Sequence, residues 1–195
     1  MENFKRVARN LEVLPLLNAV KRKDFLWKEI TARQDTVGSP HTDTQSIFLR
    51  GPLEQTVESI FNDPSAMNYP AMEQLTESHQ LIHALADIVN AREIGRIMVV
   101  SLAPGGFITP HVDEGKYADH FERFHIILAT NPDCWFQCNH DQDSAEFVRM
   151  KVGEAWWFNH KREHTFMNEG ETPRIHLIAD MVAPIYRKER DAIRH

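Results

Sequence analysis

The pattern of hydrophobic and polar residues changes near residue 95. Before that point Leu, Ile, Val and Ala recur at helical spacing over residues 3–23 and 72–91, and a strand is predicted at residues 45–50. After it, short apolar or aromatic runs predict strands at residues 96–103, 121–129, 134–138, 146–152, 155–158 and 174–182. Turn formers separate these runs at the close spacing that is typical of an antiparallel sandwich or jelly roll. We therefore predict helices and loops followed by a mainly β region.

Composition and charge narrow the function. With 42% hydrophobic and 26% charged residues and no internal repeat, we expect one soluble domain over residues 1–195. The chain holds no apolar stretch of membrane-spanning length and its start lacks the apolar core of a signal peptide, so we expect a cytoplasmic protein. Cys134 and Cys138 suit buried thiols better than a disulfide framework. The net charge of -6 argues against nucleic acid and anionic membranes, which leaves a small-molecule or peptide substrate.

A candidate metal site begins with His111 and Asp113. Alternate residues of a strand point to one face, so these two side chains would converge if both lay in the strand that follows the turn at residues 104–106. His164, from a later strand, would complete a set of two histidines and one carboxylate. Such a set holds one face of Fe(II) and leaves the other free. Zinc hydrolases use the same ligand types, so the set alone does not select iron.

Arg174, soon after His164, favours a keto-acid co-substrate. A hydrolase needs no buried cation beside its metal. In contrast, 2-oxoglutarate has a distal carboxylate that a guanidinium can hold in a bidentate, charge-assisted pair. In the strand predicted at residues 174–182, successive side chains point to opposite faces, so that Arg174 and His176 share one face and Ile175 and Leu177 the other.

At these residues the sequence resembles the Fe(II)- and 2-oxoglutarate-dependent dioxygenases, and within them the aspartyl/asparaginyl β-hydroxylase-like family, which includes free-proline hydroxylases. The resemblance covers about residues 96–182, and the N-terminal half is only loosely similar. The segments that carry it are Pro104-Gly105-Gly106, Pro110-His111-Val112-Asp113, Arg123-Phe124-His125, Trp157-Phe158-Asn159, His164 and Arg174-Ile175-His176-Leu177-Ile178.

The resemblance implies a double-stranded β-helix (jelly roll, cupin-like) core over residues 96–183, supported by residues 1–95. It implies that His111, Asp113 and His164 hold Fe(II), with no catalytic residue beyond the metal centre. Arg174 would pair with the distal carboxylate of 2-oxoglutarate, which is used together with O2. The cofactor-binding set is completed by Arg123 and His125, which match a family pair that contacts the co-substrate.

Each of these roles has a structural alternative. Arg123 could form a surface salt bridge with Glu122 or Asp119, and His125 could be a hydrogen-bonded core histidine. His160 competes with His164 as third ligand, although the family pattern favours His164. Substrate contacts are the least anchored, and the candidates are Arg50 and Asn159.

Other groups of residues suggest weaker sites. His79 and His83 share one face of a predicted helix but have no acidic partner between them. Cys134, Cys138 and His140 resemble half of a zinc site, for which strand packing is the better explanation. The aromatic residues Trp135, Trp156 and Trp157 are mainly core candidates, and the charged run at residues 187–190 is expected to be solvated surface.

The resulting hypothesis is an oxygenase that uses Fe(II) and 2-oxoglutarate to hydroxylate a C–H bond of an amino-acid-like or peptidyl substrate, with succinate and CO2 as products. The alternative is a cupin-like metal-binding protein with isomerase, hydrolase or no activity. A nucleic-acid-modifying domain is disfavoured by the acidic balance and the lack of a basic aromatic strip. Oligomeric state and substrate identity are not predicted.

Overall fold

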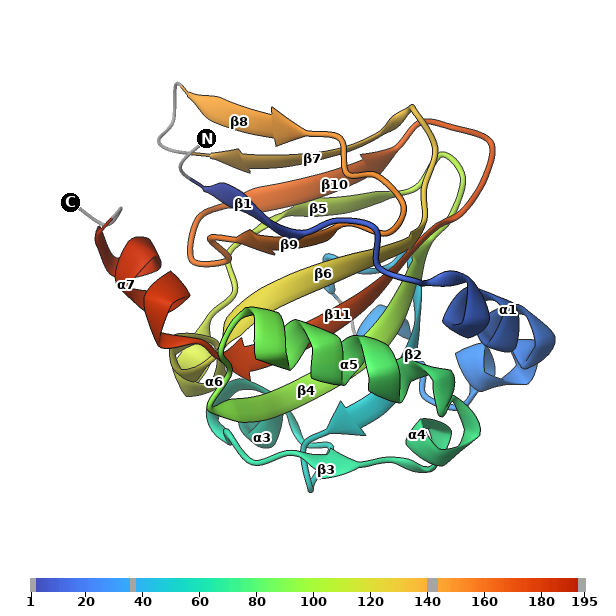
Figure 1. Ribbon diagram of the computed structural model, residues 1–195, viewed down its shortest axis with the longest axis horizontal. Helices are drawn as coiled ribbons and strands as arrows, with labels where there is room; N and C mark the ends of the chain where they lie inside the picture. Colours follow the sequence, from blue (N-terminus) through green and yellow to red (C-terminus); the bar gives the residue numbers. More distant parts are fainter. Residues whose placement is uncertain (1–2, 36–37, 140–143, 193–195) are drawn as a thin grey trace.

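The computed structural model describes residues 3–35, 38–139 and 144–192, and Figure 1 shows its ribbon. The strands are β1 (Phe4–Ala8), β2 (Thr44–Gly51), β3 (Met67–Asn68), β4 (Glu93–Leu102), β5 (Phe107–His111), β6 (Glu122–Ala129), β7 (Cys134–Asn139), β8 (Ala145–Val148), β9 (Ala155–Phe158), β10 (His164–Asn168) and β11 (Arg174–Val182). The helices are α1 (Leu14–Arg22), α2 (Ala32–Asp35), α3 (Val57–Asn62), α4 (Pro70–Gln74), α5 (Glu77–Ile88), α6 (Gly115–His120) and α7 (Pro184–Ala192), with a 3-10 helix at Asp24–Lys28.

The strands form two antiparallel sheets. The larger has the order β1-β9-β6-β11-β4-β2-β3 and the smaller the order β5-β10-β7-β8. Aromatic rings fill the space between them. Phe136 of the smaller sheet lies 4.8 Å from Phe4 and 4.7 Å from Phe158 of the larger sheet, measured between ring centroids. This arrangement confirms the prediction of a mainly β protein with a jelly-roll core.

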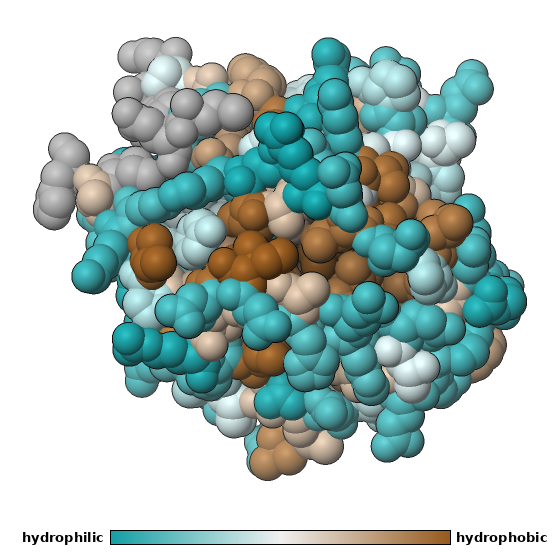
Figure 2. Space-filling model, in the orientation of Figure 1, coloured by the Kyte–Doolittle hydropathy of each residue, from teal (hydrophilic) through white to brown (hydrophobic). Residues whose placement is uncertain are grey.

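Helices cover the outer face of the larger sheet. Figure 1 shows α5 laid across β4 and β11, with α1 beside it. Leu16 and Leu85 from these helices are fully buried in one cluster with Leu177 of β11. On the face drawn in Figure 2, apolar residues form a band near β9 and β6, bordered by hydrophilic side chains. None of the helices in the described part of the chain has the length and apolarity needed to cross a bilayer.

Strand β11 shows how alternation separates packing from chemistry. Every second side chain, from Ile175 to Met181, enters the core beneath the helices. The others point between the sheets, and these are Arg174, His176, Ile178 and Asp180. The sheet therefore presents polar groups to the interior while its outer face is held by apolar contacts.

The predicted strands at residues 45–50, 96–103, 121–129, 134–138 and 155–158 match observed strands to within a few residues, and 174–182 is the range of β11. The prediction of helix over residues 3–23 was wrong at its start. Phe4–Ala8 forms β1, which pairs with β9 and places Phe4 opposite Phe158. The helix predicted at residues 72–91 is divided into α4 and α5, and the strand predicted at 146–152 ends at Val148.

The C-terminal charged run was also predicted incorrectly in part. Arg190 of α7 is 3% exposed, because its guanidinium lies 2.9 Å from the carboxylate of Glu122 at the start of β6. Glu122 is itself fully buried and accepts a hydrogen bond from the indole of Trp157. The run therefore attaches the last helix to the larger sheet.

Candidate metal centre

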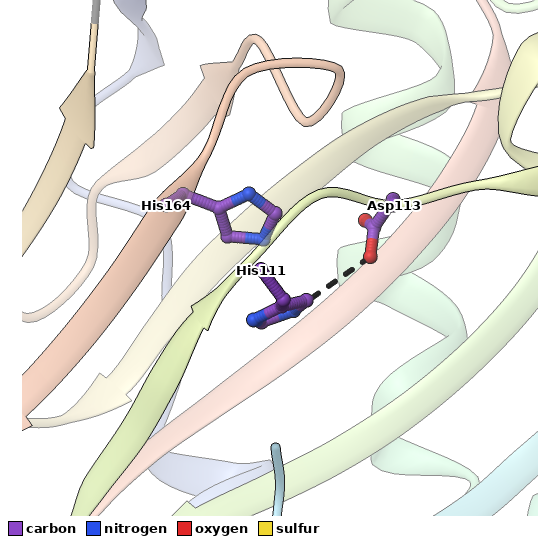
Figure 3. A group of neighbouring side chains, drawn as sticks. All are labelled: His111, Asp113 and His164. Carbon is purple, nitrogen blue, oxygen red and sulfur yellow. Dashed lines mark ion pairs between the residues drawn. The ribbon is translucent and has the colours of Figure 1, made fainter. Parts of the chain in front are cut away.

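The structure brings together the three side chains predicted as metal ligands. His111 is the last residue of β5, Asp113 follows the strand, and His164 is the first residue of β10. Because β10 pairs with β5 with His164 opposite His111, the two imidazoles meet at one end of the smaller sheet. Figure 3 shows the three side chains pointing toward one another, and their ligand atoms all lie within 4.8 Å. The expected alternation within one strand was wrong for Asp113, which approaches from the loop after β5.

Backbone carbonyl groups orient both imidazoles. Nδ1 of His111 lies 2.8 Å from the carbonyl oxygen of Thr109, and Nδ1 of His164 lies 2.9 Å from that of Arg162. A carbonyl only accepts, so each Nδ1 carries the ring proton and donates it. Each Nε2 therefore keeps a free lone pair, and burial lowers the pKa of His164 to about 3. Both imidazoles are in the neutral form that binds metal ions.

Arg123 fixes the carboxylate of Asp113. Its Nη1 donates to Oδ2 of Asp113 at 2.6 Å, while Nε and Nη2 donate to Asp180 at 2.8 and 3.0 Å. Burial alone would raise the pKa of Asp113, but Arg123 together with the neighbouring His164, His160 and His111 outweighs it and holds that pKa well below its usual range. The other oxygen, Oδ1, lies 3.8 Å from Nε2 of His111. The alternative of a surface salt bridge with Glu122 or Asp119 is thus wrong for Arg123.

Arg174 lies in a cavity next to this cluster. The cavity has a free volume of about 20 Å³ and is lined by residues of both sheets, including His111, His164, Arg123, His125 and Arg174. Arg174 is 2% exposed, and its guanidinium carbon lies over the ring of Phe166, 4.1 Å from the ring centroid. Its Nη1 is buried without a hydrogen-bond partner among the described residues. A buried donor without a partner is costly, so this position favours a ligand with an acceptor group.

Hydrogen bonds connect Arg174 to His125 through His176. Nε and Nη2 of Arg174 lie 3.0 and 2.9 Å from the two ring nitrogens of His176, Nε2 and Nδ1. Burial and the charge of Arg174 lower the pKa of His176, so the ring is neutral. Its Nδ1 also lies 3.2 Å from Nδ1 of His125. Nε2 of His125 is buried and has no partner in the described chain.

Two further residues, Arg33 and His41, line the same cavity. Arg33 belongs to α2 and donates from Nη2 to Nε2 of His41 at 3.0 Å. The rings of His41 and His111 are 5.0 Å apart. Sequence reasoning did not assign them a role, because they lie in the loop-rich N-terminal half. The only available signal was the segment His41-Thr42-Asp43 before a predicted strand.

Several sequence candidates lie elsewhere. His160 is outside the three-residue cluster found among the described residues, and its Nε2 donates to the carbonyl oxygen of Ala118 at 2.8 Å. Arg50 donates to Asn68 and to the carbonyl of Ile94, and Asn159 contacts Asn3. Neither Arg50 nor Asn159 is among the residues that line the cavity, so the predicted substrate contacts have no support.

The structure also shows where the residues of the weaker candidate sites lie. His79 and His83 are exposed on α5, outside the candidate cluster of the described chain. Cys134 and Cys138 are buried free thiols, in agreement with the packing explanation, while His140 lies outside the described residues. Trp156 is buried in the cluster between the sheets, and Trp157 is buried in the cluster beneath the helices. Trp135 makes an edge-to-face contact with Phe147.

A family model, described as aspartyl/asparaginyl beta-hydroxylase, matches residues 59–184. The chain belongs to this family. The match includes the His111, Asp113 and His164 cluster and Arg174, and it leaves out Arg33 and His41. Among curated proteins, this member of the aspartyl/asparaginyl beta-hydroxylase family is similar to the L-proline cis-4-hydroxylase of Rhizobium meliloti (strain 1021), with 25% identity over 123 residues. The similar stretch covers 63% of this chain and 39% of that enzyme's length.

Solved structures share the fold. A prolyl-4-hydroxylase from Pseudomonas putida superposes with a TM-score of 0.54 and 12% identity, covering 92% of each chain. An oxidoreductase of the 2OG-Fe(II) oxygenase family from Burkholderia pseudomallei gives a TM-score of 0.54 and 15% identity, covering 84% of this chain and 77% of that one. At such identities the comparison supports the jelly-roll fold of this family member and nothing more specific.

The residues at the centre of this aspartyl/asparaginyl beta-hydroxylase family member fit Fe(II). Two neutral imidazoles and an ionised carboxylate are a donor set that suits this ion and leaves coordination positions open. His111 and His164 each have a free Nε2, and Asp113 has one oxygen that Arg123 does not occupy. The same donor types bind zinc, and Arg174 again favours a keto-acid ligand nearby.

Proposed function

We propose that the protein is an oxygenase that uses Fe(II), 2-oxoglutarate and O2 to hydroxylate a C–H bond of an amino-acid-like or peptidyl substrate. The observation that carries this proposal is the buried Arg174, with an unpartnered Nη1, in one cavity with the His111, Asp113 and His164 cluster. The similarity of the chain to a proline hydroxylase supports the same reaction class.

Three residues would hold the metal, and their surroundings would keep them competent. His111 and His164 present Nε2 because their Nδ1 protons are bound to backbone carbonyls, and Asp113 stays ionised beside Arg123. When bound, Fe(II) supplies the oxygen chemistry that couples decarboxylation of 2-oxoglutarate to succinate with hydroxylation of the substrate.

The other polar residues of the cavity would orient the co-substrate. Arg174 Nη1 is a charged donor for the distal carboxylate, and Nε2 of His125 is a second buried polar atom without a partner among the described residues. The free volume of about 20 Å³ holds about one water, so ligands must displace side chains that now fill the space. Phe158, Phe166 and Ile108 then exclude water from the reacting groups.

Succinate formation by the Fe(II)-loaded protein tests the proposal. Protein is incubated with ascorbate, O2 and 2-oxoglutarate, and succinate is measured with and without each free amino acid and a set of peptides. We expect slow succinate formation alone and a stimulation by the true substrate. Asp113→Ala is expected to abolish succinate formation, whereas Arg50→Gln, at a residue that does not line the cavity, is expected to retain it.

Two outcomes count against the proposal. One is the absence of 2-oxoglutarate binding to the metal-loaded protein by calorimetry. The other is succinate formation that survives in both Asp113→Ala and Arg174→Met. Tight zinc retention without 2-oxoglutarate binding would instead support a cupin-like protein with non-oxidative activity.

A further inference from the structure

Arg33 is a half-buried cation to which the proposed reaction assigns no partner. It lines the cavity together with Arg123 and Arg174. Arg123 is neutralised by Asp113 and Asp180, and Arg174 is assigned to the co-substrate. Among the described residues, no carboxylate lies within ion-pair distance of Arg33, whose hydrogen bonds go to the neutral groups Ser46 and His41. Burial lowers its pKa to about 10, which leaves it charged at neutral pH.

His41 adds a second donor beside Arg33. A guanidinium has donors only, so Nε2 of His41 accepts the bond from Arg33 Nη2. Because Nε2 accepts that bond, the ring proton of His41 is on Nδ1. That Nδ1 is buried and has no partner in the described part of the chain. The pair thus offers N–H donors and no acceptor, which is the complement of an anion.

The position of the pair suits the substrate better than the co-substrate. Arg174 projects from β11, whereas Arg33 comes from α2 and lies over β2, where its Nη1 is 3.4 Å from Oγ of Ser46. The two guanidinium groups therefore enter the cavity from different elements. His41 packs against the ring of His111, so the Arg33 and His41 pair adjoins the metal cluster.

We propose that Arg33 and His41 bind a carboxylate of the substrate, so that the substrate is a small molecule with a free carboxylate, such as an unblocked amino acid. The α-carboxyl group of an internal peptide residue is converted to an amide, which lacks the charge that the guanidinium of Arg33 selects. This inference rests on the proposed function and narrows its substrate class. Arg33 acts here as a specificity-determining residue and takes no part in the oxygen chemistry.

Calorimetry without O2 tests the inference apart from turnover. Mn(II)-loaded protein with saturating 2-oxoglutarate is titrated under argon with each of the protein amino acids and with the corresponding carboxamides. We expect at least one amino acid to bind about tenfold or more tightly than its carboxamide, because the amide lacks the charge. In Arg33→Gln that preference disappears and the Kd of the amino acid rises about 10- to 100-fold. Arg33→Lys keeps the charge but loses the paired N–H donors of the guanidinium, so its Kd for the amino acid is expected to lie between those of wild type and Arg33→Gln.

Controls separate this role from folding and from co-substrate binding. Arg22→Gln removes an exposed arginine of α1 and is expected to leave every Kd unchanged. The Kd of 2-oxoglutarate is expected to stay within about threefold in Arg33→Gln, because Arg174 holds that ligand. The comparison of acid with amide uses the wild-type protein, so it stands even if Arg33→Gln fails to fold.

Three results overturn the inference. They are equal binding of acids and amides, binding of no amino acid, and a parallel loss of 2-oxoglutarate affinity in Arg33→Gln, which would assign Arg33 to the co-substrate. Each of these results counts against the inference alone when wild-type protein binds 2-oxoglutarate in the same experiment. Failure of the proposed function itself is recognised separately, because 2-oxoglutarate would then not bind to wild-type protein at all.

Discussion

Replacing Arg123 by methionine removes the group that joins two acidic side chains of the cavity wall. Arg123 is bound to Asp113 by one hydrogen bond of 2.6 Å and to Asp180 by two, of 2.8 and 3.0 Å. The side chains of Arg123, Asp113 and Asp180 are 18%, 15% and 2% exposed, so solvent cannot replace the lost partner at Asp180. Methionine keeps much of the apolar stem but none of the charge.

The expected loss of stability is large. Removing one member of a buried ion pair costs about 3–5 kcal/mol, because an uncompensated charge stays behind. The partial exposure of Asp113 favours the lower half of this range. For a chain of this length the loss lowers Tm by roughly 6–20 °C. Metal affinity is expected to fall about 10- to 100-fold as well, since Asp113 loses the group that orients it and keeps it ionised.

Urea unfolding of metal-free protein and titration with Mn(II) measure the two effects. Asp180→Asn is the matched variant, because it removes the charge of Asp180 while leaving the bond between Arg123 and Asp113. We expect it to lose stability with less than about a threefold change in metal affinity. Arg22→Met, an exposed arginine, is expected to change stability by less than about 0.5 kcal/mol. Wild-type metal affinity in Arg123→Met would refute the argument that Arg123 positions Asp113.

Three further predictions concern stability and reactivity. Glu122→Gln leaves Arg190 without its buried partner and should cost about 3 kcal/mol in urea unfolding, whereas an unchanged midpoint would show that α7 is held by other contacts. Burial raises the pKa of Cys138 to about 12, so Ellman's reagent should not react with it at pH 8 until urea unfolds the protein, and rapid native labelling would contradict this. Burial lowers the pKa of His125 and His176, so the unfolded chain binds more protons and the free energy of unfolding should fall as pH drops below about 6.5. A flat profile between pH 7.5 and 5, or the same slope in His176→Gln, would exclude that explanation.

The local pattern of apolar residues was sufficient to predict the strands whose side chains are buried in the core. Residues 155–158 and 174–182 have the apolar content of buried strands, and both ranges were predicted to the residue. The cluster of His111, Asp113 and His164 could be predicted as a set because its members lie in the β-rich half, where turn spacing limits how the chain returns. The sequence also predicted that Arg174 and His176 share a face.

The failures come from contacts between distant parts of the chain. Phe4–Ala8 has no strong period of its own and becomes a strand because β9 offers it an edge. Arg190 was predicted to be solvated, since a charge run carries no local sign of the buried Glu122 that it meets. Arg33 and His41 enter the cavity from a region of loops, whose path over β2 no periodicity reports.

Strand β5 lies at the edge of the smaller sheet and has β10 as its sheet neighbour in the described chain. It is five residues long, and its last residue, His111, stands opposite His164. An ion held by both imidazoles would therefore cross-link β5 to β10, and β5 is an edge strand that otherwise depends on a few backbone hydrogen bonds. Short edge strands open locally at low energy. Amide exchange in β5 should then slow on metal loading while exchange in β11, at the centre of the larger sheet, is unaffected. The strand that carries His111 would thus be ordered by the same ion that the reaction needs.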